Sequence, residues 1–236
     1  MASGRRLEGK RALVTGTSRG IGRAVAERLG GEGAWVACGV RREEDGPGAV
    51  AAVVAAGGEG TWVHLDVTDP ASVATAVERA SRPGRRIDVV VNSAGINRAT
   101  PLAGDALSDE AWHATFDVNV SGTWRVLRAA LPFLPDGARL VNLSSISGRP
   151  GFPGEAAYCA SRHAVIGLSR ALAKELAPRR ITVNAACPGW IDTDPGRDDV
   201  AGAPSEVAGL VVWLCSDDAR YVTGQAIVID GRMVMP

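Results

Sequence analysis

Short, nearly continuous apolar runs alternate along this sequence with longer segments of helix-forming composition. Such runs are typical of strands buried on both faces, and the segments between them are typical of helices that cover those faces. The alternation predicts an α/β fold, a doubly wound parallel sheet of the Rossmann type. The predicted strands are residues 11–15, 35–40, 61–65, 87–91, 139–143, 180–186 and 225–230.

Glycine, proline and capping residues set the limits of the predicted helices. Gly30 and Gly31 are expected to end the first helix, and Asp69 with Pro70 to begin the third. Asn119 falls in the middle of the longest helix; because Asn is a poor helix former, we expect its side chain to be exposed or engaged in a buried place. The predicted helices are residues 23–29, 49–56, 71–81, 108–131, 156–174 and 205–216.

Composition favours one compact domain over residues 1–236, since the chain is 46% hydrophobic and 22% charged and shows no internal repeat or linker. The 26 acidic and 26 basic side chains balance, so no strong field favours nucleic acid or an anionic membrane as partner. No apolar run approaches the ~20 residues that span a bilayer, and residues 1–10 lack the apolar segment of a signal peptide. A cytoplasmic location is therefore expected.

The pattern of cysteines also favours a cytoplasmic location. None of the four cysteines forms a C-x-x-C pair, and most lie in predicted strands or helices, so we expect reduced thiols and no metal site. They are Cys38, Cys159, Cys187 and Cys215.

The strongest local signal is a glycine-rich turn between the first strand and the first helix. Glycines allow a tight turn and a close approach of backbone to ligand, and a helix N-terminus offers free N–H groups to a phosphate. A turn of this kind after a strand and before a helix indicates dinucleotide binding, the alternative being a purely structural turn. Its candidate binding residues are Gly16, Ser18, Arg19, Gly20, Ile21 and Gly22.

The end of the second strand bears on the choice of dinucleotide. Many dinucleotide folds carry there an acidic residue that binds the ribose hydroxyls of NAD. This chain has Val40 followed by Arg41 and Arg42, which could pair with a 2′-phosphate, and Arg19 could add a third charge. The sequence therefore favours NADP(H); alternatively, residues 41–45 are only a solvated charge run.

Tyr158 and Arg162 lie four positions apart in a predicted helix, and so on one face, one turn apart. A phenol has a pKa of ~10, and a fixed cation nearby favours the phenolate. The pair is a candidate acid/base; the alternative is a Tyr that merely packs.

The order of the motifs resembles the short-chain dehydrogenase/reductase family, in its shorter single-domain branch, and most of all its 3-oxoacyl-carrier-protein-reductase-like ketoreductases, including those of polyketide pathways. The likeness covers residues 10–231. It depends on the glycine turn, Asp66-Val67, Asn92-Ser93-Ala94-Gly95, Asn119-Val120, Ser144-Ser145, Tyr158, Pro188-Gly189 and Val222-Thr223-Gly224.

The resemblance implies catalytic roles. Tyr158 would protonate a carbonyl oxygen, Ser145 would hydrogen-bond that oxygen, and Asn119 would anchor a water in a proton relay. Further cofactor contacts would come from Asp66, Val67, Asn92, Ala94, Gly95, Pro188, Gly189, Ile191 and Thr193, besides Tyr158 and Arg162.

The chain departs from the family at Arg162, where the family has a catalytic Lys that binds the nicotinamide ribose, lowers the Tyr pKa and passes a proton onward. A guanidinium can serve the first two purposes, but it does not readily release a proton. Either the enzyme remains a reductase with a relay through the ribose hydroxyl and water, or redox activity is weakened or lost.

A second departure is the segment 191–204, where the family usually has a longer helical lid. Here it is short and polar, which predicts a more open cleft that admits a bulky or carrier-tethered substrate. Arg149, Phe152 and Trp190 are expected wall residues by position.

These observations predict an NADP(H)-dependent ketoreductase acting on a small-molecule carbonyl substrate. The alternatives are a non-redox isomerase or cyclase on the same fold and a nucleotide-sensing module. By resemblance, the chain is expected to form a homo-oligomer, a tetramer or a dimer.

Overall fold

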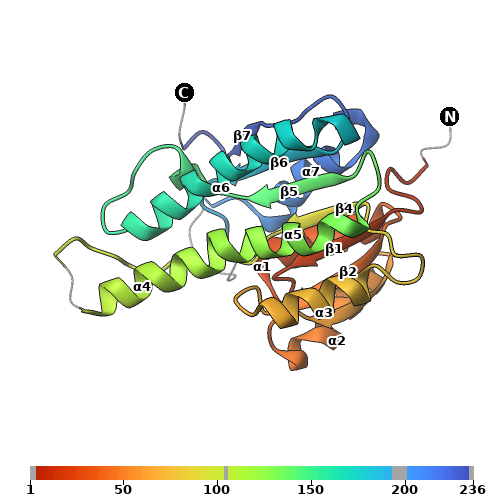
Figure 1. The fold of residues 1–236 in the computed structure, drawn as a ribbon, viewed down its shortest axis with the longest axis horizontal. Coiled ribbons are helices and arrows are strands. Elements are labelled where there is room, and N and C mark those ends of the chain that lie inside the picture. Colours follow the sequence, from red (N-terminus) through yellow and green to blue (C-terminus); the bar gives the residue numbers. More distant parts are fainter. Residues whose placement is uncertain (1–3, 104–105, 193–200, 234–236) are drawn as a thin grey trace.

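The computed structural model describes residues 4–103, 106–192 and 201–233. All the described strands join one parallel sheet of seven strands in the order β3-β2-β1-β4-β5-β6-β7 (Figure 1). Direction along the sheet reverses between β1 and β4, and at such a point the loops beyond the strand ends separate and leave a crevice. The strands are β1 (Arg11–Thr15), β2 (Trp35–Val40), β3 (Glu59–His64), β4 (Val89–Asn92), β5 (Arg139–Leu143), β6 (Thr182–Pro188) and β7 (Ala226–Ile229).

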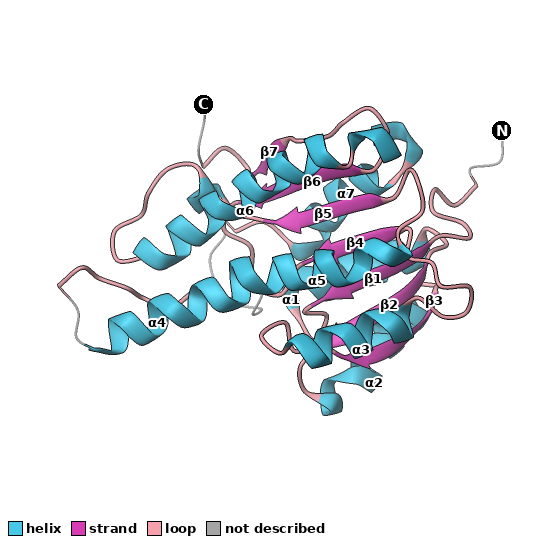
Figure 2. Ribbon diagram, viewed as in Figure 1, coloured by secondary structure: helices cyan, strands magenta, loops and turns pink. Residues whose placement is uncertain are grey.

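Helices cover both faces of the sheet (Figure 2). The buried clusters show that α1, α2 and α7 pack on one face, and α3, α5 and α6 on the other. The helices are α1 (Gly20–Gly31), α2 (Gly46–Ala55), α3 (Pro70–Ala80), α4 (Ala106–Phe116), α5 (Thr123–Ala130), α6 (Ala156–Glu175) and α7 (Pro204–Cys215).

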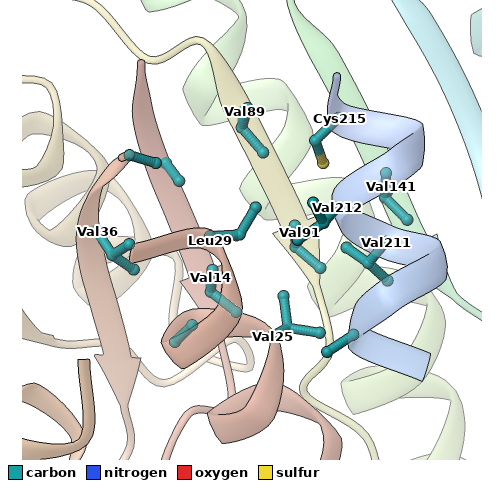
Figure 3. Packing of buried hydrophobic residues seen from close by; sticks show 14 of the residues in the cluster. Val14, Val25, Leu29, Val36, Val89, Val91, Val141, Val211, Val212 and Cys215 are labelled. Carbon is teal, nitrogen blue, oxygen red and sulfur yellow. The ribbon is translucent and has the colours of Figure 1, made fainter. Parts of the chain in front are cut away.

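Successive side chains along each strand point to opposite faces of the sheet, and this divides the core into two layers. In β1, Val14 faces α1 and α7, whereas Leu13 faces the opposite layer. Figure 3 shows Val91 of β4 between Leu29 of α1 and Val211 of α7, all of them fully or almost fully buried. Because both faces of each central strand are covered, the strands are apolar almost throughout.

The α/β prediction is confirmed, and the differences lie mostly at element ends. Helix α1 continues through Gly31 instead of ending before Gly30. Gly30 is a packing residue: a Cβ there would lie 2.7 Å from Val53 Cγ1 of α2, so the glycine permits close contact between the helices. Strand β6 runs from Thr182 to Pro188, later than expected, because Arg180 adopts a left-handed conformation with φ +54°.

The predicted long helix is continuous, but it has three parts. A π-helical segment (Asp117–Gly122) separates α4 from α5. Asn119 lies in this segment and is 1% exposed, so its side chain is engaged in a buried place rather than exposed. Wide turns of this type frequently occur at functional sites.

The four cysteines are free and buried. Burial raises the pKa of Cys38 and of Cys215 to about 12 and also raises that of Cys187, so these thiols stay protonated near neutral pH. No helix in the described ranges is long and apolar enough to cross a membrane.

Candidate active site

A cleft of about 1380 Å³ lies along the carboxyl ends of the strands. Its lining combines the turn after β1, the ends of β2 and β3, the loops after β4, β5 and β6, and the first turn of α6. This is where a doubly wound sheet binds its ligand. The predicted site residues that line it are Gly16, Ser18, Arg19, Gly20, Ile21, Gly22, Arg41, Arg42, Asp66, Val67, Ala94, Gly95, Ser145, Tyr158, Arg162, Pro188, Gly189 and Ile191.

The glycine turn has the geometry that a phosphate requires. Gly16 has φ +72°, and a Cβ on it would lie 2.9 Å from Ala94 Cα, so only glycine fits between the ends of β1 and β4. Thr15 Oγ1 accepts hydrogen bonds from the N–H groups of Ser93 and Ala94, both at 3.0 Å, and this ties the two strand ends together. The first turn of α1 contains no acidic residue, so its N–H groups face the cleft without a competing carboxylate.

Charged side chains of both signs line the cleft where β2 and β3 end. Arg41, Arg42, Asp45 and Asp66 all line the cleft. Partial burial acts to raise the pKa of Asp66, but two hydrogen bonds from Thr68 and the charge of Arg41 outweigh it and hold that pKa below its ordinary value. Asp66 is therefore an ionised acceptor at neutral pH.

Ser145 and Tyr158 line the same cleft, one from the end of β5 and the other from α6. Ser145 follows β5, and its Oγ accepts a hydrogen bond from Ser147 N at 3.1 Å, which leaves the hydroxyl hydrogen for a further acceptor. Tyr158 lies in the first turn of α6, half-buried, with its ring on the cleft wall. A carbonyl oxygen bound here can meet two O–H donors.

Arg162 lies under Tyr158, as the spacing predicted. Its Cζ is 4.8 Å from the centroid of the Tyr158 ring, and the side chain is buried. One guanidinium nitrogen, Nη1, donates to the carbonyl oxygen of Leu143 at 2.8 Å. The other, Nη2, lies 2.5 Å from where a Cβ on Gly95 would be, so a larger residue at position 95 would displace this end of the guanidinium. Arg162 thus connects the end of β5 to the loop after β4.

The backbone of Arg162 strengthens this connection. Ser144 Oγ donates to the carbonyl oxygen of Arg162 at 2.9 Å. Side chain and backbone together fix the end of β5 against α6, and so fix Ser145 relative to Tyr158.

Asn119 lies behind the cleft wall rather than in it. Its Oδ1 accepts from Ile96 N at 2.9 Å, and its Nδ2 donates to Ile96 O at 2.9 Å and to Ser161 Oγ at 3.0 Å. Both amide hydrogens are used, so a water held by this residue must bond to one of its oxygen atoms. The side chain positions the loop after β4 against α6.

Asn92 was expected among the cofactor contacts, but it is 3% exposed and does not line the cleft. Its Nδ2 donates to Asn142 Oδ1 at 2.9 Å, and Asn142 Nδ2 donates to Ser169 Oγ at 2.9 Å. This buried chain of hydrogen bonds joins β4, β5 and α6, so Asn92 holds together the elements that surround the site.

Thr100 is a residue that the sequence analysis missed. It is 5% exposed, and its Oγ1 accepts from Ala157 N at 2.9 Å, while its own N–H donates to Gly154 O at 2.8 Å. Glu155, at the start of α6, makes no side-chain capping bond, so Thr100 caps the helix from another segment. No local pattern marks a cap that is supplied 57 residues earlier in the chain.

Other cleft residues were missed because they carry no family motif. Asn97 and Glu155 join opposite walls through a hydrogen bond of 3.0 Å from Asn97 Nδ2 to Glu155 Oε1. Trp190 lines the cleft as expected, whereas Arg149 and Phe152 do not belong to its described lining. Thr193 and most of the short segment expected to leave the cleft open lie outside the described residues.

The sheet order, the glycine turn at a helix N-terminus and the cleft at the strand ends define a dinucleotide-binding α/β protein. A family model described as short chain dehydrogenase matches residues 10–202, and a second, described as Enoyl-(Acyl carrier protein) reductase, matches residues 198–233. The chain belongs to the short-chain dehydrogenase family of oxidoreductases.

Individual relatives agree along nearly the whole chain. The 3-oxoacyl-(acyl-carrier-protein) reductase FabG of Escherichia coli is 38% identical over 246 residues, with 97% of this chain and 99% of that protein covered. A short chain dehydrogenase from Burkholderia cenocepacia, solved with NADP, superposes with a TM-score of 0.89 at 37% identity, covering 96% and 98% of the two chains. A blue fluorescent protein from a metagenomic library, solved with NADPH, superposes with a TM-score of 0.89 at 35% identity, covering 98% of this chain and 100% of that protein.

Proposed function

We propose that this protein is an NADP(H)-dependent reductase that converts a ketone into a secondary alcohol. The observation that carries the proposal is the shared cleft: the ends of β1 and β2 contribute the glycine turn, Arg41 and Arg42, and the end of β5 with helix α6 contributes Ser145, Tyr158 and Arg162. Two relatives of similar structure were solved with NADP or NADPH. The residues present fit such a cofactor, because Gly16 and Gly22 leave no room for a Cβ in the turn, and the β2 end offers cations for a 2′-phosphate.

In this proposal the bound cofactor supplies the hydride that attacks the carbonyl carbon. Ser145 donates its hydroxyl hydrogen to the carbonyl oxygen and polarises the C=O bond. Tyr158 transfers its phenolic proton to that oxygen as the alcohol forms. Arg162 stabilises the resulting phenolate through its fixed charge beside the ring, 4.8 Å from the ring centroid.

Proton return to Tyr158 cannot pass through Arg162, because a guanidinium does not give up its proton. With a cofactor bound, its ribose hydroxyl and water would have to carry that proton. A bulky or carrier-tethered ketone is the proposed substrate on the likeness to a relative, since the cleft of about 1380 Å³ has to hold cofactor and substrate together. The reductase of E. coli named above acts on 3-oxoacyl groups bound to acyl carrier protein, as its name states.

The test is the fall in NADPH absorbance with a panel of ketones, from small keto esters to 3-oxoacyl thioesters and polycyclic ketones, with NADH in parallel. Carbonyl-dependent oxidation of NADPH supports the proposal. A large rise in that rate in Arg162→Lys would show a reductase limited by its proton relay. NADPH binding without turnover in both forms would contradict the proposal and favour a nucleotide-sensing module or a non-redox enzyme.

A further inference from the structure

The turn after β2 places an acid among the bases expected to hold the 2′-phosphate. Arg41, Arg42 and Asp45 all line the same cleft as the glycine turn. A preference for NADP(H) requires net positive charge at this place, since a phosphate monoester carries close to two negative charges at neutral pH. The partner of each arginine therefore decides how much of that charge is available.

Arg42 is already engaged by Asp45. Its Nε donates to Asp45 Oδ2 at 3.1 Å and its Nη2 donates to Asp45 Oδ1 at 3.0 Å, the paired geometry in which guanidinium binds carboxylate most firmly. Glu44 Oε1 lies 3.6 Å from the same Nε. The Nε–Nη2 edge of Arg42, one of the two donor edges that suit a phosphate, is thus occupied by a carboxylate of its own turn.

Asp45 has no other described contact that explains its presence. It stands at the N-cap position of α2 but makes no side-chain capping bond. Its side chain is 22% exposed, compared with 62% for that of Arg42, so the carboxylate is the more firmly placed partner. Arg41 forms no such pair within the described residues, and its charge acts on Asp66.

We propose that Asp45 is a specificity residue that lowers the preference for a 2′-phosphorylated dinucleotide, an inference that rests on the proposed NADP(H) function. Asp45 acts in two ways: it occupies the guanidinium of Arg42, and its own charge repels the phosphate. Arg41 makes the principal phosphate contact, and Arg42 contributes only after it exchanges Asp45 for the ligand. The chain is therefore able to use NADH as well, with a smaller margin between the two cofactors than two free arginines would give.

The test is to titrate the full-length protein with NADPH and with NADH, following cofactor fluorescence, in Asp45→Asn and in the wild type. Asp45→Asn is expected to lower the Kd for NADPH by about two- to fivefold, the range of an exposed ion pair, without lowering that for NADH. The gain should shrink at high salt because these charges are exposed. In an Arg42→Gln background the same substitution should lower the Kd for NADPH by a smaller factor, because only the repulsion between Asp45 and the phosphate is then removed.

Glu43→Gln is the matched control, because it removes one negative charge from the same turn at an exposed position that does not line the cleft. An equal gain in Glu43→Gln would overturn the proposal in favour of a general charge effect. An unchanged ratio of the two Kd values in Asp45→Asn would also overturn it, while leaving the reductase proposal intact. If neither cofactor binds the wild type, the proposed function itself fails, and the inference fails with it.

Discussion

The side chain of Arg162 makes several contacts at once in this site. Its guanidinium bonds to Leu143 O, lies beside the ring of Tyr158 and fills the space above Gly95. Its Nε is buried and has no hydrogen-bond partner in the described part of the chain. A lysine here would keep the charge but would place a single nitrogen, so it could not make the same set of contacts.

The clearest prediction at this scale concerns Tyr158. Replacing it with Phe removes the O–H group that protonates the substrate, and the ring still packs on Arg162. We expect kcat for ketone reduction to fall at least about 100-fold, the usual contribution of a general acid, with little change in the Kd for NADPH. Stopped-flow absorbance and cofactor titration measure the two quantities.

The chain provides its own control for this experiment. Its other tyrosine, Tyr221, is 99% exposed and does not line the cleft, so Tyr221→Phe should leave kcat unchanged. Full activity in Tyr158→Phe would exclude Tyr158 as the proton donor.

At the scale of elements, the first turn of α6 depends on a cap from outside the helix. In Thr100→Val the side chain keeps its shape, but the N–H of Ala157 loses its acceptor. The free energy of unfolding should fall by about 1–2 kcal/mol. Because Tyr158 follows Ala157, kcat should fall by about tenfold, within the loss that a 1 Å misplacement causes, with the Kd for NADPH unchanged. Thermal unfolding and steady-state kinetics test both.

Thr100→Ser separates capping from packing, since it keeps the hydroxyl and removes only a methyl group. We expect it to restore most of kcat relative to Thr100→Val. If Ser and Val variants lost activity equally, the hydroxyl would have no role in holding Tyr158.

Two helical glycines should respond to alanine in opposite directions. In Gly30→Ala the new Cβ would lie 2.7 Å from Val53 Cγ1, so overpacking of about 1–3 kcal/mol should exceed the gain in helix propensity of ~1 kcal/mol. In Gly209→Ala, on α7, no described atom outside the helix's own backbone lies within 4 Å of the new Cβ, so stability should rise by about 0.5–1 kcal/mol. Urea denaturation measures both, and a stabilised Gly30→Ala would contradict the packing assigned to α1 and α2.

For the whole molecule, the expected homo-oligomer can be tested at one surface, the exposed side of the long helix. Trp112 and Trp124, on the long helix that forms an outer face of the molecule, remain 38% and 43% exposed (Figure 1). We predict that Trp124→Glu shifts the mass found by light scattering toward that of one chain, because burying a carboxylate in an apolar interface is costly. A wild-type protein that is already monomeric would refute this.

The layered fold and most of the cleft follow from the amino-acid sequence alone. Alternating apolar runs record which segments are buried, and the residues just after each strand must meet at one edge of a parallel sheet. For that reason Gly16, Asp66, Gly95 and Ser145 were placed correctly on the cleft, and the spacing of Tyr158 and Arg162 on one helix face needed no tertiary information.

The way in which distant segments hold these residues in place depends on the tertiary structure. Thr100 caps a helix that begins 56 positions later (156 − 100), Asn119 joins Ile96 to Ser161, and Asn92 bonds to Asn142 rather than lining the cleft. Local patterns record burial and propensity, but not which neighbour a side chain will meet. That choice depends on the strand order and on the packing of α6 against the strand ends, where most buried polar groups are hydrogen-bonded.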